Sequence, residues 1–230
     1  MGVNYNPKIV TDGLVLALDA DNPKSYPGSG STWFDISGNG RNYSIGSGIS
    51  WNSTGYFSIA GGTFTGPASN LFNFGSTNNH TIEVYARTTQ TTYNDFFRWR
   101  ASPSVGVDTR AIQTHLYYSN GRTYYDISGC CATNQRIDYP NDASLTTGIR
   151  HLVWRTRTNQ TPNRQFFKNL VSQVDSGVNS TATVTWNRTD AATIGNGWRG
   201  NLYTFYVYNR ALSDNELKQN FNALRGRYGI

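Results

Sequence analysis

The sequence predicts an all-β protein built as a two-sheet antiparallel sandwich with one short helix at its C-terminal end. Three observations support this fold class. Apolar and polar residues alternate with a period of two in many segments, which is the strand pattern. Turn-forming Gly, Asn and Ser residues recur at short intervals between them. Only one segment has helical spacing. Because neither a repeat nor a linker interrupts the pattern, residues 1–230 are predicted to form a single domain.

The expected strands follow in chain order. The run GLVLALDA at 13–20 is continuously apolar, which predicts a central strand buried on both faces. In TIEVYAR at 81–87, Ile82, Val84 and Ala86 are predicted to face the core, and Glu83 to point outward. Asn120-Gly121 between two aromatic runs predicts a hairpin. Further alternating segments lie at 151–158, 181–187 and 202–209.

The predicted helix covers about residues 213–225. Ser213 and Glu216 form the Ser-x-x-Glu pattern of a capping box, which closes the free N–H groups at a helix start. Leu217, Phe221 and Leu224 follow at helical spacing, so we expect them to pack on the sandwich or to close one of its ends. A helix that binds a partner is the alternative.

Composition excludes several classes of protein. The net charge is +6, but the sixteen Arg and four Lys are scattered, so the basic stripe of a nucleic-acid-binding surface is not expected. No apolar run has the length of a membrane span, and the N-terminus lacks the pattern of a signal peptide. The only cysteines, Cys130 and Cys131, are adjacent and cannot staple the fold. We therefore expect a protein made in a cytoplasm without structural disulfides.

Two terminal blocks carry a family resemblance. The opening GLVLALDADNPKSYPGSGSTWFDISGNGRN and the closing GNGWRGNLYTFYVYNRALSDNELKQNF resemble the two ends of a laminin G-like domain of the concanavalin A-like jelly-roll superfamily. The segments TIEVYARTT and RHLVWRTRT stand where that family has its central strands. Two positions depart from the family pattern. Leu202-Tyr203-Thr204 replaces an Ile-Asp-Glu, and Lys168-Asn169 replaces an Asp-Gly turn.

The combination of NPKIVTDGLVLALDADNPKSYPGSG with NFNALRGRYGI resembles, more narrowly, the versions of this domain in virion proteins of tailed bacteriophages, especially those of cyanobacteria. The resemblance implies a non-enzymatic virion component, a capsid decoration or an appendage protein. It would be present in multiple copies per particle and would bind other virion proteins in the head, tail or fibre. The alternative is a lectin or adhesin for glycans of the host surface, and a less favoured alternative is a glycoside hydrolase.

Catalysis is disfavoured because the chain has only two glutamates. Glycoside hydrolysis requires a pair of carboxylates at a fixed separation. Glu216 is used by the helix cap, and Glu83 has no acidic residue two positions away. Asp126 and Asp138 are candidates for an aspartate-only site, but nothing in the sequence pairs them.

The stretch WFDISGNGRNYS contains candidate ligands for Ca²⁺. Asp35, Ser37 and Asn39 match the first positions of a calcium loop, but Gly46 stands where a bidentate Glu is needed, which excludes an EF-hand. A weaker calcium site at Asp35 and Asn39 is one hypothesis. The alternative is a turn in which both side chains bind their own backbone.

Glycan binding would need aromatic rings and amides at an accessible surface. The candidates are aromatic or amide residues in polar segments: Trp33, Tyr43, Trp51, Asn196 and Trp198. The alternative for each aromatic residue is a place in the core, because buried Trp and Tyr supply much of a core's area.

Overall fold

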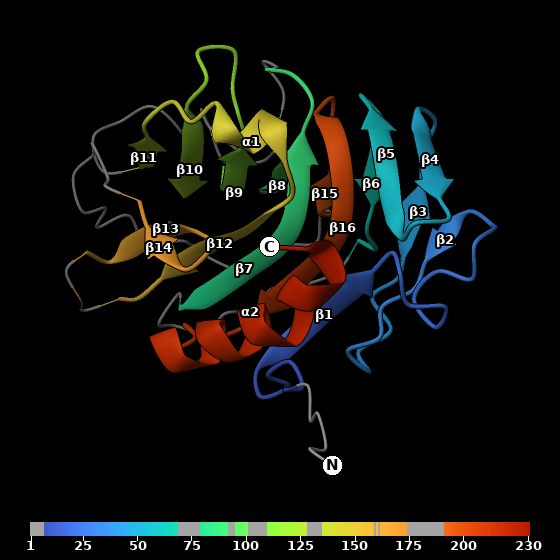
Figure 1. Ribbon diagram of the computed structural model, residues 1–230, viewed down its shortest axis with the longest axis horizontal. Helices are drawn as coiled ribbons and strands as arrows, with labels where there is room; N and C mark the ends of the chain where they lie inside the picture. Colours follow the sequence, from blue (N-terminus) through green and yellow to red (C-terminus); the bar gives the residue numbers. More distant parts are fainter. Residues whose placement is uncertain are drawn as a thin grey trace.

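The computed structural model describes residues 7–68, 79–91, 95–100, 110–127, 135–158, 160, 162–173 and 191–230, which form two antiparallel sheets and two helices (Figure 1). The first sheet has the order β14-β13-β12-β7-β16-β5-β4, and β1 also pairs with β16. The second has the order β11-β10-β9-β8-β15-β6-β3-β2. The predicted jelly-roll sandwich is confirmed. The predicted strand at 181–187 and the cysteines at 130 and 131 lie outside the described residues.

The strands of each sheet have the following bounds. Those of the first sheet are β1 (Leu14–Asp19), β4 (Ile49–Asn52), β5 (Tyr56–Ala60), β7 (His80–Thr88), β12 (Arg150–Thr156), β13 (Arg164–Lys168), β14 (Val171–Ser172) and β16 (Arg199–Tyr208). Those of the second are β2 (Thr32–Trp33), β3 (Tyr43–Ile45), β6 (Phe64–Thr65), β8 (Phe97–Arg100), β9 (Arg110–His115), β10 (Thr123–Ile127), β11 (Arg136–Tyr139) and β15 (Thr193–Ile194).

The main core lies between the two sheets. Ile82, Val84 and Ala86 of β7 belong to it, which confirms their predicted orientation. Aromatic rings from the two sides meet there, for example those of Phe97 and Phe205, whose centroids are 5.2 Å apart. Because such rings each bury a large area, this moderately apolar sequence fills a sandwich core.

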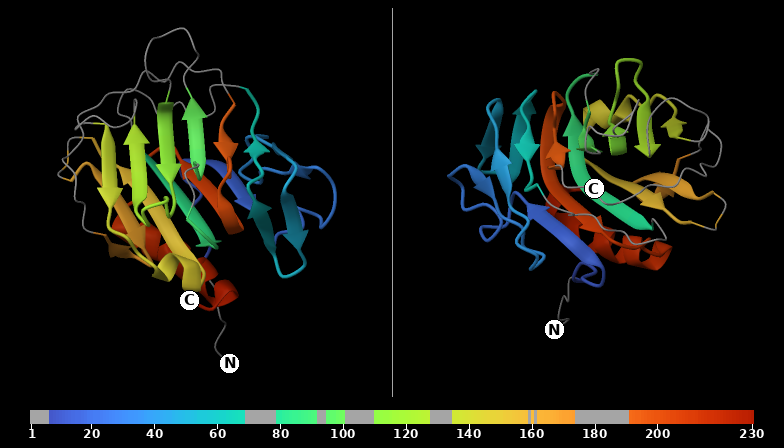
Figure 2. Two further views of the ribbon diagram at one scale, coloured as in Figure 1. Left: turned by 90° about the horizontal axis from the view of Figure 1, so that it is seen from above. Right: turned by 180° about the vertical axis from the view of Figure 1, so that it is seen from behind.

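Helix α2 (Asp214–Tyr228) covers the other face of the first sheet, so that this sheet lies between the helix and the second sheet (Figure 2). The predicted capping box at Ser213 and Glu216 is present. Hydrogen bonds from Arg210 and Ser213 lower the pKa of the Glu216 carboxyl to about 2. Leu217 and Leu224 pack on the sheet in a second core, which confirms the helix as a packing element. A one-turn helix, α1 (Ser144–Thr147), was not predicted.

The prediction for Glu83 is corrected because α2 covers the face of the first sheet on which this residue lies. This side chain does point away from the main core, but it is fully buried beneath the helix rather than exposed to solvent. One carboxylate oxygen lies 2.7 Å from His151 Nε2, and the other accepts a hydrogen bond of 2.6 Å from Asn220 of α2. Glu83 therefore ties two strands to the helix.

Strand β1 is largely buried but is not a central strand. Among the strands that the structure describes it pairs only with β16, and the loop at 35–41 covers its other edge. Asp35 accepts from the Ala17 N–H at 2.9 Å, and Arg41 donates to the Val15 carbonyl at 2.6 Å. Since an open strand edge invites pairing with other chains, this loop protects the sheet.

Neither described helix has the length and apolar character that crossing a membrane requires.

Candidate functional site

Three of the predicted glycan-binding aromatics lie inside the core. Trp33, Tyr43 and Trp198 each have 0% of their surface exposed. The Trp33 ring packs 4.9 Å from Phe57 and 4.9 Å from Phe64, measured between centroids. Their ring faces are covered by other side chains, so the structure supports the core alternative and corrects the glycan-stacking hypothesis at these three positions.

The other two candidates lie partly exposed in different surroundings. The Trp51 indole N–H donates to the Ala20 carbonyl at 2.9 Å, and its ring packs against Tyr26. Asn196 donates to Asp95 at 3.1 Å. Since three of the five residues are interior, the predicted set does not form one accessible surface.

The Asp35 loop has the geometry of a self-closed turn. The Ala17 and Ser37 N–H groups donate to Asp35 Oδ1, and the Arg41 N–H and the Ser37 hydroxyl donate to Oδ2, all at 2.9 Å. Asn39 donates to the Ser37 hydroxyl at 2.9 Å. Within the described ranges, no three His, Cys, Asp or Glu side chains gather as a metal-binding group. A turn closed by its own hydrogen bonds, the alternative to a calcium site, therefore accounts for both Asp35 and Asn39.

We expect the melting temperature of the protein to be the same in chelator and in added Ca²⁺, because protein donors already occupy both Asp35 oxygens. Asp35→Ala should lower the free energy of unfolding by about 1–2 kcal/mol, since it removes the acceptor of four donors. Asp35→Asn keeps one such oxygen and should cost less. A melting temperature that rises with Ca²⁺ in the wild type but not in Asp35→Ala would support the calcium hypothesis instead.

The outward side of the second sheet carries a network of polar side chains. We call it the polar face, and its residues are Asp95, Arg98, Gln113, His115, Tyr124, Asp126, Arg136 and Asn196. Asp126 is fully buried and accepts two hydrogen bonds of 2.7 Å from Arg136, whose guanidinium lies 4.4 Å from the Tyr124 ring centroid. Hydrogen bonding to Asp126 raises the pKa of the Arg136 guanidinium.

His115 stands between two carboxylates of the polar face. Its Nδ1 lies 3.6 Å from Asp95 and its Nε2 lies 3.9 Å from Asp126. Asp95 also pairs with Arg98 at 2.7 Å. Each carboxylate therefore has an arginine partner among the described residues.

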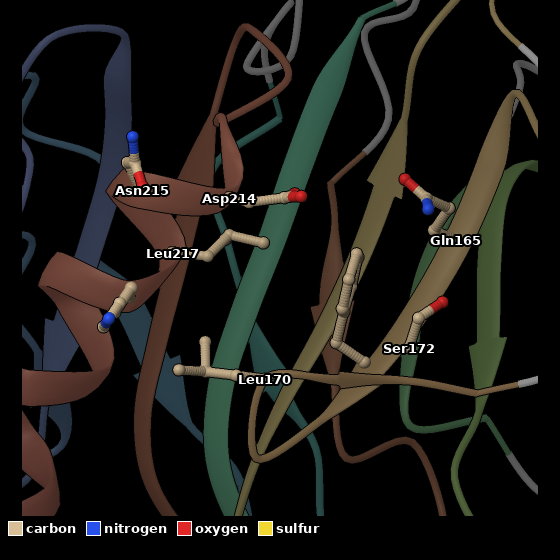
Figure 3. Close-up of a pocket in the computed structure, with 8 residues that line it drawn as sticks. Gln165, Leu170, Ser172, Asp214, Asn215 and Leu217 are labelled. Atoms are coloured by element: carbon tan, nitrogen blue, oxygen red, sulfur yellow. The ribbon is translucent and has the colours of Figure 1, made fainter.

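An open pocket of about 360 Å³ lies on the helix side of the first sheet, between the β13–β14 hairpin and the start of α2. This volume is in the range of small-ligand pockets. We call it the helix pocket, and it is lined by Gln165, Phe167, Leu170, Ser172, Asp214, Asn215, Leu217 and Lys218. Figure 3 shows Asp214 and Gln165 projecting toward one another from opposite walls, while Asn215 points away.

One wall of the helix pocket is apolar. Phe167 and Leu217 belong to the second core, Leu170 packs against it, and all three line the pocket. Leu170 has a φ of 66°, and Asn169 before it a φ of 48°, so the tight turn lies at Asn169-Leu170, one residue later than the Lys168-Asn169 position that the family resemblance gave, because Lys168 is still part of β13. A leucine in this left-handed region is strained. This strained residue, Leu170, is one whose side chain forms part of the pocket wall.

A buried arginine organises the polar side of the helix pocket. Arg155 has 2% of its surface exposed, and its guanidinium lies 4.7 Å from the Phe167 ring centroid. It donates to Gln165 Oε1 at 2.7 and 3.1 Å and to Asp214 Oδ1 at 2.7 Å. One side chain thus fixes the orientation of two polar groups on opposite walls.

Sequence reasoning did not identify the helix pocket. It identified the helix on one side and, on the other, only a turn position at Lys168-Asn169. The turn at Asn169-Leu170 and the cap at Ser213 place Leu170 and Asp214 at the ends of their elements. Nothing in the sequence shows that these segments come together. Arg155 lies on the same face of β12 as Val153, opposite the core-facing Leu152 and Trp154, and the sequence alone does not show that α2 covers this face.

No protein-family model matches the sequence, and neither does any curated protein. Solved structures do match in fold. Trypanosoma rangeli sialidase matches 93% of this chain with a TM-score of 0.65 and 14% identity. The binding domain of botulinum neurotoxin DC in complex with SialylT matches 93% with a TM-score of 0.66 and 14% identity, and the same domain with rat synaptotagmin II matches 94% with a TM-score of 0.67.

These matches show the fold, a jelly-roll β-sandwich, and no closer relationship. This chain corresponds to 33% of the sialidase chain and to 52% of the toxin domain. The matched structures named here include no phage protein, so the virion expectation depends on the sequence resemblance alone.

Proposed function

We propose that this chain is a non-catalytic saccharide-binding domain and that the helix pocket holds one sugar residue. The observation that carries the proposal is the pairing of an apolar wall with polar groups that Arg155 holds in place. A sugar ring has an apolar face and a rim of hydroxyl groups, so it needs both kinds of surface at once. The pocket supplies them from two elements, the β13–β14 hairpin and helix α2.

The fold comparisons support this proposal over a purely structural role. The T. rangeli sialidase has been solved with sialic acid, and the botulinum neurotoxin DC binding domain with SialylT. Both are larger chains, and the same sandwich serves as a part of each. The second toxin complex, with synaptotagmin II, indicates that a protein partner is compatible with this fold as well.

A non-catalytic role agrees with the positions of the carboxylates. Glu83 is buried under α2, and Glu216 is held by Arg210 and the helix cap. Asp126 is paired with Arg136. Reducing-sugar release from any bound glycan would contradict this part of the proposal.

Lys218→Ala should weaken saccharide binding about five- to tenfold without a loss of stability, because Lys218 is an exposed rim residue of the pocket whose ammonium can donate to a sugar oxygen. A matched control is Lys24→Ala, which removes the same charge from an exposed turn outside the pocket. Glycan-array screening would identify a binder, and titration calorimetry would compare the variants. A blank array, or equal weakening in both variants, would contradict the proposal.

The sequence resemblance supports a second proposal, that the domain belongs to a bacteriophage virion and is present there in multiple copies. It would be made in the host cytoplasm and would contact other virion proteins. Mass spectrometry of purified particles should find the chain at a fixed ratio to the major capsid protein. Absence of the chain from purified particles would overturn this second proposal and would not affect the proposal of saccharide binding.

A further inference from the structure

The polar groups of the helix pocket form an oriented donor and acceptor. Arg155 takes up one atom of each: Gln165 Oε1 on the strand wall and Asp214 Oδ1 on the helix wall. The remaining atoms are Gln165 Nε2, which can only donate, and Asp214 Oδ2, which accepts when the carboxylate is ionised. Neither atom makes a hydrogen bond to any other residue in the described part of the chain, so both are available at the pocket walls.

The apolar side chains of the helix pocket lie beside this pair. Leu217 follows Asp214 by three positions, on the same side of α2. Leu170 extends the wall from the strained turn of the hairpin, and Phe167 closes it against Arg155. A ligand group that fills the pocket therefore needs a hydrogen-bond acceptor, a hydrogen-bond donor and a small apolar end within a few atoms of one another.

We propose that the helix pocket selects sugars that carry an acetamido group. The acetamido carbonyl accepts from Gln165 Nε2, its N–H donates to Asp214 Oδ2, and its methyl group packs against Leu170 and Leu217. The sugar ring then lies toward Ser172 and Lys218 at the rim. This inference rests on the proposed saccharide binding and adds the class of sugar.

An isosteric pair of substitutions tests the assignment. Gln165→Glu keeps an oxygen for Arg155 and replaces the donating amide with an accepting oxygen. Asp214→Asn keeps the bond to Arg155 and can replace the accepting oxygen with a donor. Both preserve size, so the fold should persist, and melting curves would verify this. Lys24→Ala serves again as the control outside the pocket.

The measurement is the affinity of each protein for N-acetylglucosamine, glucosamine and glucose, preferably as the repeating unit of short oligomers. The wild type should bind the acetamido sugar at least about tenfold more tightly than the other two, because a site built around a polar group discriminates against ligands that leave its partners unpaired. In Gln165→Glu and in Asp214→Asn this ratio should fall to about one to three, while Lys24→Ala keeps it.

The outcomes separate the two proposals. Binding in the pocket without an acetamido preference overturns this inference and leaves saccharide binding intact. A preference that survives both isosteric substitutions also overturns it, because the selecting groups then lie elsewhere. Failure of every sugar to bind overturns both proposals.

Discussion

Replacing Glu83 by alanine should lower the free energy of unfolding by about 3 kcal/mol, because the carboxylate is fully buried and holds partners on two other elements. His151 of β12 and Asn220 of α2 would each lose a hydrogen bond inside the protein. Asn220 in turn accepts from the Val10 N–H at 2.7 Å and donates to the Tyr208 hydroxyl at 3.0 Å. The loss at Glu83 therefore affects the docking of α2 and the N-terminal segment together.

Glu83→Gln is the matched control for this prediction. Glutamine has the same shape, keeps an oxygen for Asn220 and offers an amide to His151, whose ring nitrogen can accept in its other tautomer. It should cost clearly less than alanine. Urea unfolding, followed by tryptophan fluorescence, would measure both changes. A cost below 1 kcal/mol for Glu83→Ala would mean that the helix docks through its apolar residues alone.

The core-facing pattern of β7 and the start of α2 were predictable because each depends on local pattern. Ile82, Val84 and Ala86 alternate on β7 and lie in the main core as predicted. Ser213 and Glu216 form their cap within four residues of chain. In such cases the sequence spacing determines which side chains share a face. The tertiary fold then determines only which other element packs against that face.

The residues that were placed wrongly depend on contacts distant in sequence. Glu83 occupies the outward face of its strand, as the alternation requires, but a helix more than a hundred residues later covers that face. The helix pocket depends equally on two separate segments, the hairpin around Leu170 and the helix start at Asp214. A single sequence shows neither contact, so it shows which faces exist and not what covers them.

Trp33, Tyr43 and Trp198 were placed wrongly as glycan-stacking residues for a related reason. Trp33 follows a polar and turn-forming run at 28–32, which favours an exposed ring. In the structure it extends from the short strand β2 into the main core, where its neighbours Phe57 and Phe64 come from β5 and β6. Burial of a large ring is decided by these partners and not by the polarity of adjacent residues.

Trp33→Ala should therefore destabilise the protein by about 3–5 kcal/mol, the usual cost of removing a large aromatic side chain from a packed core. Saccharide affinity, measured at a temperature where the variant is folded, should stay at the wild-type value. Trp33→Phe fills most of the same space, and the Trp33 indole N–H has no hydrogen-bond partner within the described residues, so this control should cost much less. Thermal unfolding and sugar titration on the same samples would separate the two roles. A Trp33→Ala variant that keeps its melting temperature but no longer binds sugar would assign Trp33 to the binding site. A variant with a lowered melting temperature and unchanged sugar affinity would assign Trp33 to the core that holds the two sheets together.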